Sequence, residues 1–208
     1  RAKLVALIEH MDHGIGKVLE ALEKTGQAEN TLVIFTSDNG GQVNVGANNG
    51  PLKAGKGTVY EGGIKVPALA SWPGRIAPGS NCKRVSLTMD ILPTLLEALS
   101  VTSDEPFDGV SFLSELMGKK RAEAKREIYF IRREGGTAYG GKTIEALRWG
   151  NWKLLQNSPF QPLELYNLEA DPLEATNLAG KERGVFRDLS ARLRRELQRY
   201  GTVPWQKP

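Results

Sequence analysis

The feature that most constrains the fold is an apolar run that stops at a cluster of turn residues. Residues 32–35 read Leu-Val-Ile-Phe, and Ser-Asp-Asn-Gly-Gly follows at 37–41. A short apolar run rich in β-branched residues and bounded by turn residues is typical of a core strand in a parallel sheet. Ligands of such sheets bind beyond the carboxyl ends of the strands. Asp38 and Asn39 are therefore expected at a ligand-binding edge.

The residue types at this edge suit a metal ion and an anion. A carboxylate and an amide carbonyl are hard oxygen donors, which calcium and magnesium prefer. A glycine-rich segment, Gly-Lys-Gly-Thr at 55–58, brings back Lys56, whose ammonium offers a positive charge to an anion. The same residues are also common turn chemistry, and glycines often serve only to permit positive φ. The pattern thus indicates either a metal beside an anionic substrate or an ordinary turn.

Further motifs follow this strand in a fixed order along nearly the whole chain. They are Asp-Asn-Gly at 38–40, Gly-Lys-Gly-Thr at 55–58, Glu-Gly-Gly-Ile-Lys-Val-Pro at 61–67, Trp-Pro-Gly at 72–74, Asp-Ile-Leu-Pro-Thr-Leu-Leu at 90–96, Asp-Gly-Val-Ser at 108–111, Leu-Tyr-Asn-Leu-Glu-Ala-Asp-Pro-Leu-Glu at 165–174 and Asn-Leu at 177–178. In this order they resemble the C-terminal half of an arylsulfatase-type sulfatase of the alkaline phosphatase-like superfamily.

The resemblance implies hydrolysis of a sulfate ester by a formylglycine beside a calcium ion. Carried over position by position, Asp38 and Asn39 correspond to metal ligands, and Lys56 corresponds to a catalytic, substrate-binding residue that contacts the sulfate. Two ligands cannot supply the about six to eight oxygens that calcium takes. In the family, the Cys/Ser-x-Pro-x-Arg motif that gives the formylglycine and a pair of acidic ligands lie upstream of Asp-Asn-Gly. The isolated chain is therefore expected to be catalytically incomplete.

Three other features resemble nucleophile or metal sites. Ser71 opens Ser-Trp-Pro-Gly-Arg, which fits the bare Ser-x-Pro-x-Arg pattern, but the Pro-Gly pair at 78–79 would break the helix that the family's motif begins. Cys82, the single cysteine, lacks the following proline and arginine. The two histidines, at positions 10 and 13, could form a metal site, although a solvated helix face is the alternative. We assign none of these residues a catalytic role.

The composition does not predict nucleic acid or a membrane as a partner. The net charge is +4, but the basic residues are scattered, and the densest group, at positions 192, 194 and 195, shares a predicted helix with Glu196. No apolar run is long enough to span a membrane, and no signal peptide is visible. The resemblance implies a periplasmic, secreted or lysosomal location and a sulfated small molecule or carbohydrate as substrate.

Hydrophobic periodicity predicts an α/β region over residues 1–122. Apolar residues at three- and four-residue spacing predict an amphipathic helix over 2–24, closed by Gly26, whose stripe is expected to cover the sheet containing residues 32–36. A strand at 68–71 and a helix at 91–99 capped by Asp90 continue the alternation. We assign residues 1–122 to an incomplete alkaline-phosphatase-like parallel-sheet layer, part of the sulfatase α/β catalytic domain.

The pattern of residues 123–208 predicts a small α+β subdomain. Strands are expected at 127–131, 145–149, 152–156 and 163–167, with Gly-Asn at 150–151 as a two-residue hairpin turn. Apolar residues at 186, 189, 193 and 197 predict a C-terminal helix across this four-stranded antiparallel sheet. Loops of the corresponding family subdomain help to shape the substrate pocket, so residues 132–137 either contribute to sulfated-substrate selection or form a plain solvent loop.

Other functional interpretations stay open. The protein could be a non-catalytic sulfatase-like binding or structural module, because a fold does not fix a function. It could also be a related phosphatase or phosphonate hydrolase. A sheet that lacks its upstream strands would expose an edge and an apolar face, which predicts self-association of the isolated chain.

Overall fold

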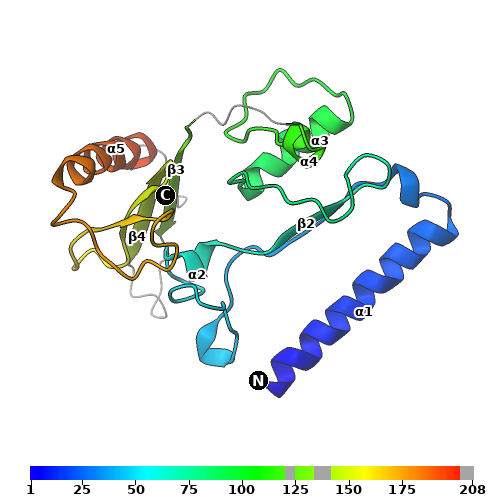
Figure 1. Ribbon diagram of the computed structural model, residues 1–208, viewed down its shortest axis with the longest axis horizontal. Helices are drawn as coiled ribbons and strands as arrows, with labels where there is room; N and C mark the ends of the chain where they lie inside the picture. The colour runs from blue at the N-terminus through cyan, green and yellow to red at the C-terminus, as the bar shows by residue number, and fades with distance from the viewer. Residues whose placement is uncertain (120–124, 134–141, 202–208) are drawn as a thin grey trace, which may run out of the picture. The chain divides into compact units, whose positions relative to one another are not determined.

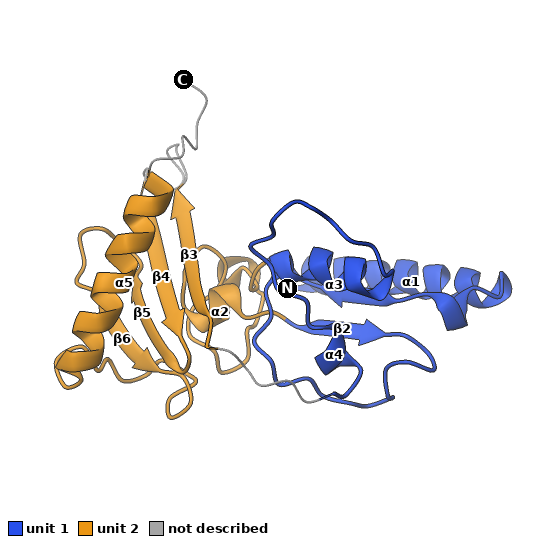
Figure 2. Cartoon of the chain, turned by 90° about the horizontal axis from the view of Figure 1, so that it is seen from above, with its two compact units in different colours: residues 1–38, 67–124 blue, residues 39–66, 125–208 orange. Residues whose placement is uncertain are grey.

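The computed structural model describes residues 1–119, 125–133 and 142–201. The chain forms two compact units, one made of residues 1–38 and 67–124 and the other of residues 39–66 and 125–208 (Figure 2). Along the described ranges, no helix is both long and apolar enough to cross a membrane. The predicted division of the chain between residues 122 and 123 stays a prediction about its domains.

The first unit begins with a long helix whose apolar stripe is exposed. Helix α1 (Ala2–Lys24) has the predicted bounds, and its C-cap residue Thr25 is followed by Gly26 with φ of +69°. None of its residues is buried, and Leu7 is 67% exposed. The expectation that this stripe covers the strand at 32–36 was wrong, and α1 runs clear of that strand (Figure 1). Two short strands offer too little surface to bury a 23-residue helix.

Strands β1 (Val33–Thr36) and β2 (Ala68–Ser71) pair with each other in antiparallel register, Val33 opposite Ser71 and Thr36 opposite Ala68. This antiparallel pair differs from the parallel sheet predicted for the region, whereas the α/β class is confirmed. A parallel return requires a crossover, usually an α-helix that packs on the sheet. The connection, every residue of which the structure describes, contains only the 3₁₀ turn η2 (Val43–Val45) and the four-residue helix α2 (Glu61–Ile64).

Asp90 precedes helix α3 (Ile91–Ala98), as predicted, but its side chain does not cap that helix. The carboxylate is fully buried and accepts the N–H groups of Leu87 at 2.9 Å and Val110 at 2.8 Å. It therefore joins the 3₁₀ turn η3 (Thr88–Asp90) to the segment that leads into helix α4 (Leu113–Leu116).

The second unit is built on the predicted four-stranded antiparallel sheet. Its strands are β3 (Glu127–Arg133), β4 (Thr143–Trp149), β5 (Trp152–Gln156) and β6 (Glu164–Asn167), in that spatial order. Gly150, with φ of +59°, forms the predicted turn between β4 and β5. The C-terminal helix α5 (Arg183–Gly201) lies along the sheet as predicted (Figure 2).

The two faces of this sheet pack against different partners. On one face, leucines of three strands form a core with α5; its buried members are Leu147, Leu154, Leu165, Leu189 and Leu193. On the other face, Ile144, Ala146, Leu155 and Tyr166 form a second core with Val59, which comes from the glycine-rich segment. Because side chains alternate along a strand, each strand supplies both cores. The sheet thus connects the C-terminal helix with the segment that carries Lys56.

Candidate functional site

Asp38 and Asn39 lie where the sequence predicts, directly after the first core strand. Asp38 is exposed and Asn39 is half-buried, and the amide Nδ2 of Asn39 donates to the Gly40 carbonyl oxygen at 3.0 Å. Asp38 is the last residue of the first unit's opening segment, and Asn39 is the first residue of the second unit. The strand β1 therefore delivers both side chains to the same turn.

The oxygen donors of Asp38 and Asn39 are of the chemical type that calcium prefers, but they are too few to hold the ion. A carboxylate and an amide oxygen are the hard ligands that calcium prefers, yet calcium takes about six to eight oxygens. Within the described ranges, no group of three or more His, Cys, Asp or Glu side chains could hold a metal ion. Asp38 and Asn39 by themselves would form at most part of a calcium site, and their ligand roles stay predictions.

Lys56 lies on a tight loop that is bonded to the turn after Asn39. The side chain of Lys56 is exposed, and its backbone N–H donates to the Gly41 carbonyl oxygen at 3.1 Å. The loop closes on itself through Thr58, whose N–H and hydroxyl both donate to the Gly55 carbonyl oxygen, at 3.1 and 2.9 Å. The structure thus brings the backbone of the predicted sulfate-binding loop next to the predicted metal-binding turn.

Asn49 fastens these two loops together, a role that the sequence analysis missed. Its Oδ1 accepts the Gly41 N–H at 2.7 Å, and its Nδ2 donates to the carbonyl oxygens of Gly41 at 3.1 Å and Ala54 at 3.0 Å. One amide side chain therefore satisfies backbone groups on both sides of the site. Its position in an Asn-Asn-Gly stretch resembles ordinary turn chemistry, so sequence gave no distinguishing signal.

The glycines of this region mainly permit close backbone approach. Gly40 donates its N–H to the Gly63 carbonyl oxygen at 2.9 Å, and a Cβ at Gly40 would lie 1.8 Å from the Gly62 carbonyl oxygen. A Cβ at Gly63 would lie 2.2 Å from the Thr58 carbonyl oxygen. Any side chain at these positions would force two backbone segments apart. The Glu-Gly-Gly motif thus lets helix α2 pack directly against the turn that carries Asn39.

A buried ion triad of Lys153, Glu61 and Glu174 fixes α2 to the sheet. The Lys153 ammonium on β5 is fully buried, 2.8 Å from Glu61 Oε1 and 2.9 Å from Glu174 Oε1. Glu174 Oε2 accepts the Glu61 backbone N–H at 2.7 Å. Burial raises the pKa of Glu174, while the Lys153 charge and hydrogen bonds oppose that shift. Because each charge has a partner, the triad ties the Glu-Gly-Gly segment to β5 and to the loop before α5.

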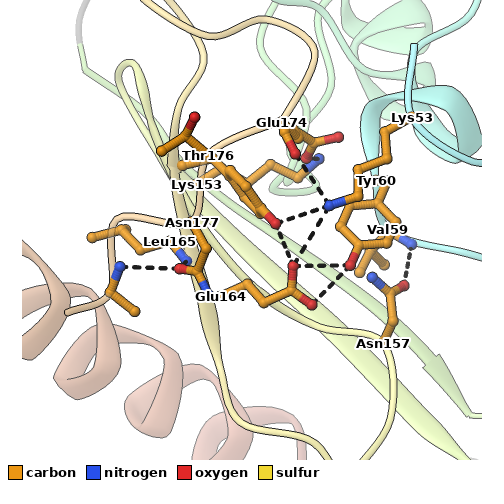
Figure 3. Close-up of polar contacts among 12 residues, drawn as sticks. Lys53, Val59, Tyr60, Lys153, Asn157, Glu164, Leu165, Glu174, Thr176 and Asn177 are labelled. Carbon is orange, nitrogen blue, oxygen red and sulfur yellow. Dashed lines mark hydrogen bonds and ion pairs between the residues drawn. The ribbon is translucent and has the colours of Figure 1, made fainter. Parts of the chain in front are cut away.

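Beside this triad, Lys53 lies against two tyrosines and a carboxylate (Figure 3). Its Nζ is 4.1 Å from the centre of the Tyr60 ring and donates to the Tyr166 hydroxyl at 3.0 Å. The Tyr60 hydroxyl donates to Glu164 Oε1 at 2.8 Å, and the Tyr166 hydroxyl also donates to Glu164. Burial, followed by the Glu164 carboxylate, raises the pKa of Tyr60 to about 12, so its hydroxyl stays a donor at neutral pH. These contacts attach residues 53–60 to β6.

Comparison with known proteins identifies the family. A family model described as "Sulfatase" matches residues 1–101, and one described as "N-sulphoglucosamine sulphohydrolase, C-terminal" matches residues 54–202. The chain belongs to the sulfatase family. Steryl-sulfatase of Mus musculus is 35% identical over 166 residues, which cover 73% of this chain and 25% of that protein. The chain therefore spans about a quarter of the length of this curated relative.

Solved structures of similar proteins share the fold. The structure of Ps i-CgsB in complex with k-i-k-neocarrahexaose superposes with a TM-score of 0.78 at 33% identity, covering 88% of this chain and 40% of that one. A phosphonate monoester hydrolase of Agrobacterium radiobacter gives a TM-score of 0.68 at 26% identity, covering 91% and 40%. Both confirm the alkaline-phosphatase-like fold that the motif order predicts.

Proposed function

We propose that residues 1–208 are part of a sulfatase that hydrolyses sulfate esters, to which they contribute two calcium ligands and one sulfate-binding lysine. The observation that carries this proposal is the bonding of the Lys56 loop to the turn after Asn39, in a chain whose family is established. Lys56 would contact the sulfate group and neutralise negative charge as the ester bond breaks. Asp38 and Asn39 would supply oxygens to calcium, which when bound polarises a sulfate oxygen.

The remaining parts of the active site are proposed to lie outside these 208 residues. The family implies a formylglycine nucleophile and further acidic ligands, and the single cysteine of this sequence does not lie in a Cys-x-Pro-x-Arg motif. We therefore expect the 208-residue chain alone to be inactive. The substrate class we propose is a sulfated carbohydrate or small molecule, which the carbohydrate complex of the similar Ps i-CgsB supports.

Substitution of Lys56 tests this function in the sulfatase that contains these residues. In Lys56→Ala the rate of sulfate ester hydrolysis should fall about 10²–10³-fold, the usual loss when one group that stabilises the transition state is removed. Lys65→Ala is the control, because this exposed lysine comes from the same segment. Equal rates for Lys56→Ala and the unsubstituted enzyme would contradict the assigned role. Calcium binding, measured by calorimetry, should weaken in Asp38→Asn.

Phosphonate hydrolysis is the second candidate, because a phosphonate monoester hydrolase shares the fold at 26% identity. Relative kcat/KM values on matched aryl sulfate, phosphate and phosphonate esters distinguish the two. A preference for the phosphonate would replace the proposed activity, whereas absence of turnover on all three would favour a non-catalytic binding module.

The 208-residue chain alone is also proposed to self-associate, through the exposed truncated sheet that the sequence predicted and through the apolar side chains of α1. Large apolar side chains of this helix, including Leu7 and Ile8 at 67% and 51% exposed, form an apolar surface of the kind that drives association. Sedimentation velocity should show dimers or larger species that dissociate in the double variant Leu7→Lys, Ile8→Glu. A monomer at high concentration would refute this.

A further inference from the structure

The loop that carries Lys56 is held from the sheet side by an arginine. Arg132 on β3 donates from Nη1 to the Gly57 carbonyl oxygen at 2.8 Å. Gly57 has φ of +93°, and a Cβ there would lie 2.8 Å from the same Nη1 atom. The guanidinium therefore fills the space next to the turn, one residue beyond Lys56.

Resting on the function proposed above, we propose that Arg132 is a positioning residue for Lys56, holding the Gly55–Thr58 turn so that the lysine ammonium is presented to the sulfate. A hydrogen bond to a charged donor is stronger than one between neutral groups. Its acceptor is a backbone carbonyl, so the bond restrains the main chain of the loop itself. Arg132 acts through the loop and is not assigned contact with the substrate.

The strand that carries Arg132 is a suitable support for this role. Arg132 pairs in register with Ile144, which is buried in the core on the loop-facing side of the sheet. Val59, two residues after Gly57, is 3% exposed in the same core, and its N–H donates to Asn157 Oδ1 at 2.9 Å. The turn is thus held at Gly57 by Arg132 and at Val59 by the core.

Backbone bonds hold the other side of the turn. The Lys56 N–H donates to the Gly41 carbonyl oxygen, and Asn49 bonds both Gly41 and Ala54. Lys56 therefore lies between one anchor on the Asn39 turn and a second anchor on the C-terminal sheet. Loss of the Arg132 bond would leave the turn held from the Asn39 side alone, so the Lys56 and Thr58 N–H bonds should open more often. Of residues 132–137, for which substrate selection and a plain solvent loop were the two alternatives, residues 134–137 lie outside the described residues.

Amide hydrogen exchange of the 208-residue chain tests the restraint without any need for activity. In Arg132→Ala, exchange of the Lys56 and Thr58 amides should quicken at least about tenfold, equivalent to about 1.4 kcal/mol. Arg148→Ala is the matched control, because Arg148 also donates to a glycine carbonyl, that of Gly150, away from the loop. The control should change exchange at Lys56 by less than about twofold.

The result that would overturn the proposal is unchanged exchange at Lys56 in Arg132→Ala, or an equal acceleration across the amides of β5. The latter would show general loss of the fold. If Arg132→Ala does not fold, Gly57→Ala tests the same contact from the loop side, since its Cβ would displace the guanidinium. Faster exchange confined to residues 55–59 in Gly57→Ala would support the restraint, and unchanged exchange would overturn it.

A double-mutant cycle in the sulfatase that contains these residues tests positioning of the lysine. Arg132→Ala should lower kcat/KM for a sulfate ester about tenfold when Lys56 is present and should cause no further loss in Lys56→Ala. An equal loss in both backgrounds would overturn the proposal. Failure of the enzyme to cleave any sulfate ester would refute the proposed function alone, because the exchange result decides the restraint independently.

Discussion

Removal of the buried Lys153 ammonium should be one of the most destabilising single changes in the second unit. In Lys153→Met the volume is nearly conserved, but the carboxylates of Glu61 and Glu174 lose a cation at 2.8 and 2.9 Å. Both acids are buried, Glu174 completely. Breaking a buried ion pair by removal of one partner costs about 3–5 kcal/mol, because the remaining charge is left uncompensated. We expect a loss of that size in the free energy of unfolding.

Arg192→Met provides the matched comparison on the opposite face of the same sheet. Arg192 also bridges two carboxylates, those of Glu127 at 2.8 Å and Asp188 at 2.9 Å, but its side chain is 22% exposed. Partly exposed ion pairs contribute about 0.2–1 kcal/mol each, so the two pairs together should account for no more than about 2 kcal/mol. Arg192 Cζ also lies 4.3 Å from the centre of the Trp149 ring, and loss of this cation–π contact adds about 0.5–1 kcal/mol.

Urea unfolding followed by tryptophan fluorescence measures both losses, since Trp149 and Trp152 pack in the core beneath α5. The Lys153→Met loss should become smaller as the pH is lowered, because burial raises the pKa of Glu174 and a protonated Glu174 no longer needs the cation. The triple variant in which Glu61→Gln and Glu174→Gln accompany Lys153→Met should recover part of the stability. Equal losses in Lys153→Met and Arg192→Met, or no recovery in the triple variant, would refute the reasoning.

Three further changes test burial, close packing and helix propensity. Burial raises the pKa of Glu145 above its ordinary value of 4.5. The stability that this carboxyl group contributes is therefore complete below pH 4.5 and is lost as the pH rises through its folded-state pKa. Glu145→Gln should raise the urea midpoint at pH 7 and change it less at pH 4. Gly40→Ala should cost at least about 1–3 kcal/mol and disorder the Asn39 turn, because its Cβ would lie 1.8 Å from a backbone oxygen. Gly14→Ala, where nothing lies within 4 Å, should instead stabilise α1 by about 0.5–1 kcal/mol in thermal unfolding.

Local patterns predicted the elements of the chain well. The bounds of α1, the four strands of the C-terminal sheet and the apolar face of α5 follow from periodicity, which each segment carries within itself. The pairing of β1 with β2 was mispredicted because strand partners are chosen by the path of the connection, and 37–67 contains no long helix. The exposed stripe of α1 was mispredicted because periodicity shows which face is apolar but not what covers it.

The supports of the candidate site could not be predicted, because their partners are distant in sequence. Lys153 is bonded to Glu61 across 92 positions, and Glu174 is bonded to the Glu61 N–H across 113 positions. Arg132 reaches Gly57 across 75 positions. Each of these residues is a single charged side chain in an otherwise ordinary strand or turn. The family motifs predicted Asp38, Asn39 and Lys56 as site residues, but they gave no indication of what holds their loops.

The ion triad also determines how β5 can pair with its neighbours. Lys153 faces the glycine-rich segment, and Leu154, the next residue, is buried in the core with α5. Because strand side chains alternate, a one-residue slip would turn Lys153 toward Leu189 and Leu193 and Leu154 toward Glu61. Both exchanges are costly, since a charge would enter an apolar core while a buried carboxylate would face a leucine. The register of β5 and the position of α2 are therefore coupled through Lys153. A variant that loses Lys153 should lose both stability and the ordered conformation of the glycine-rich segment.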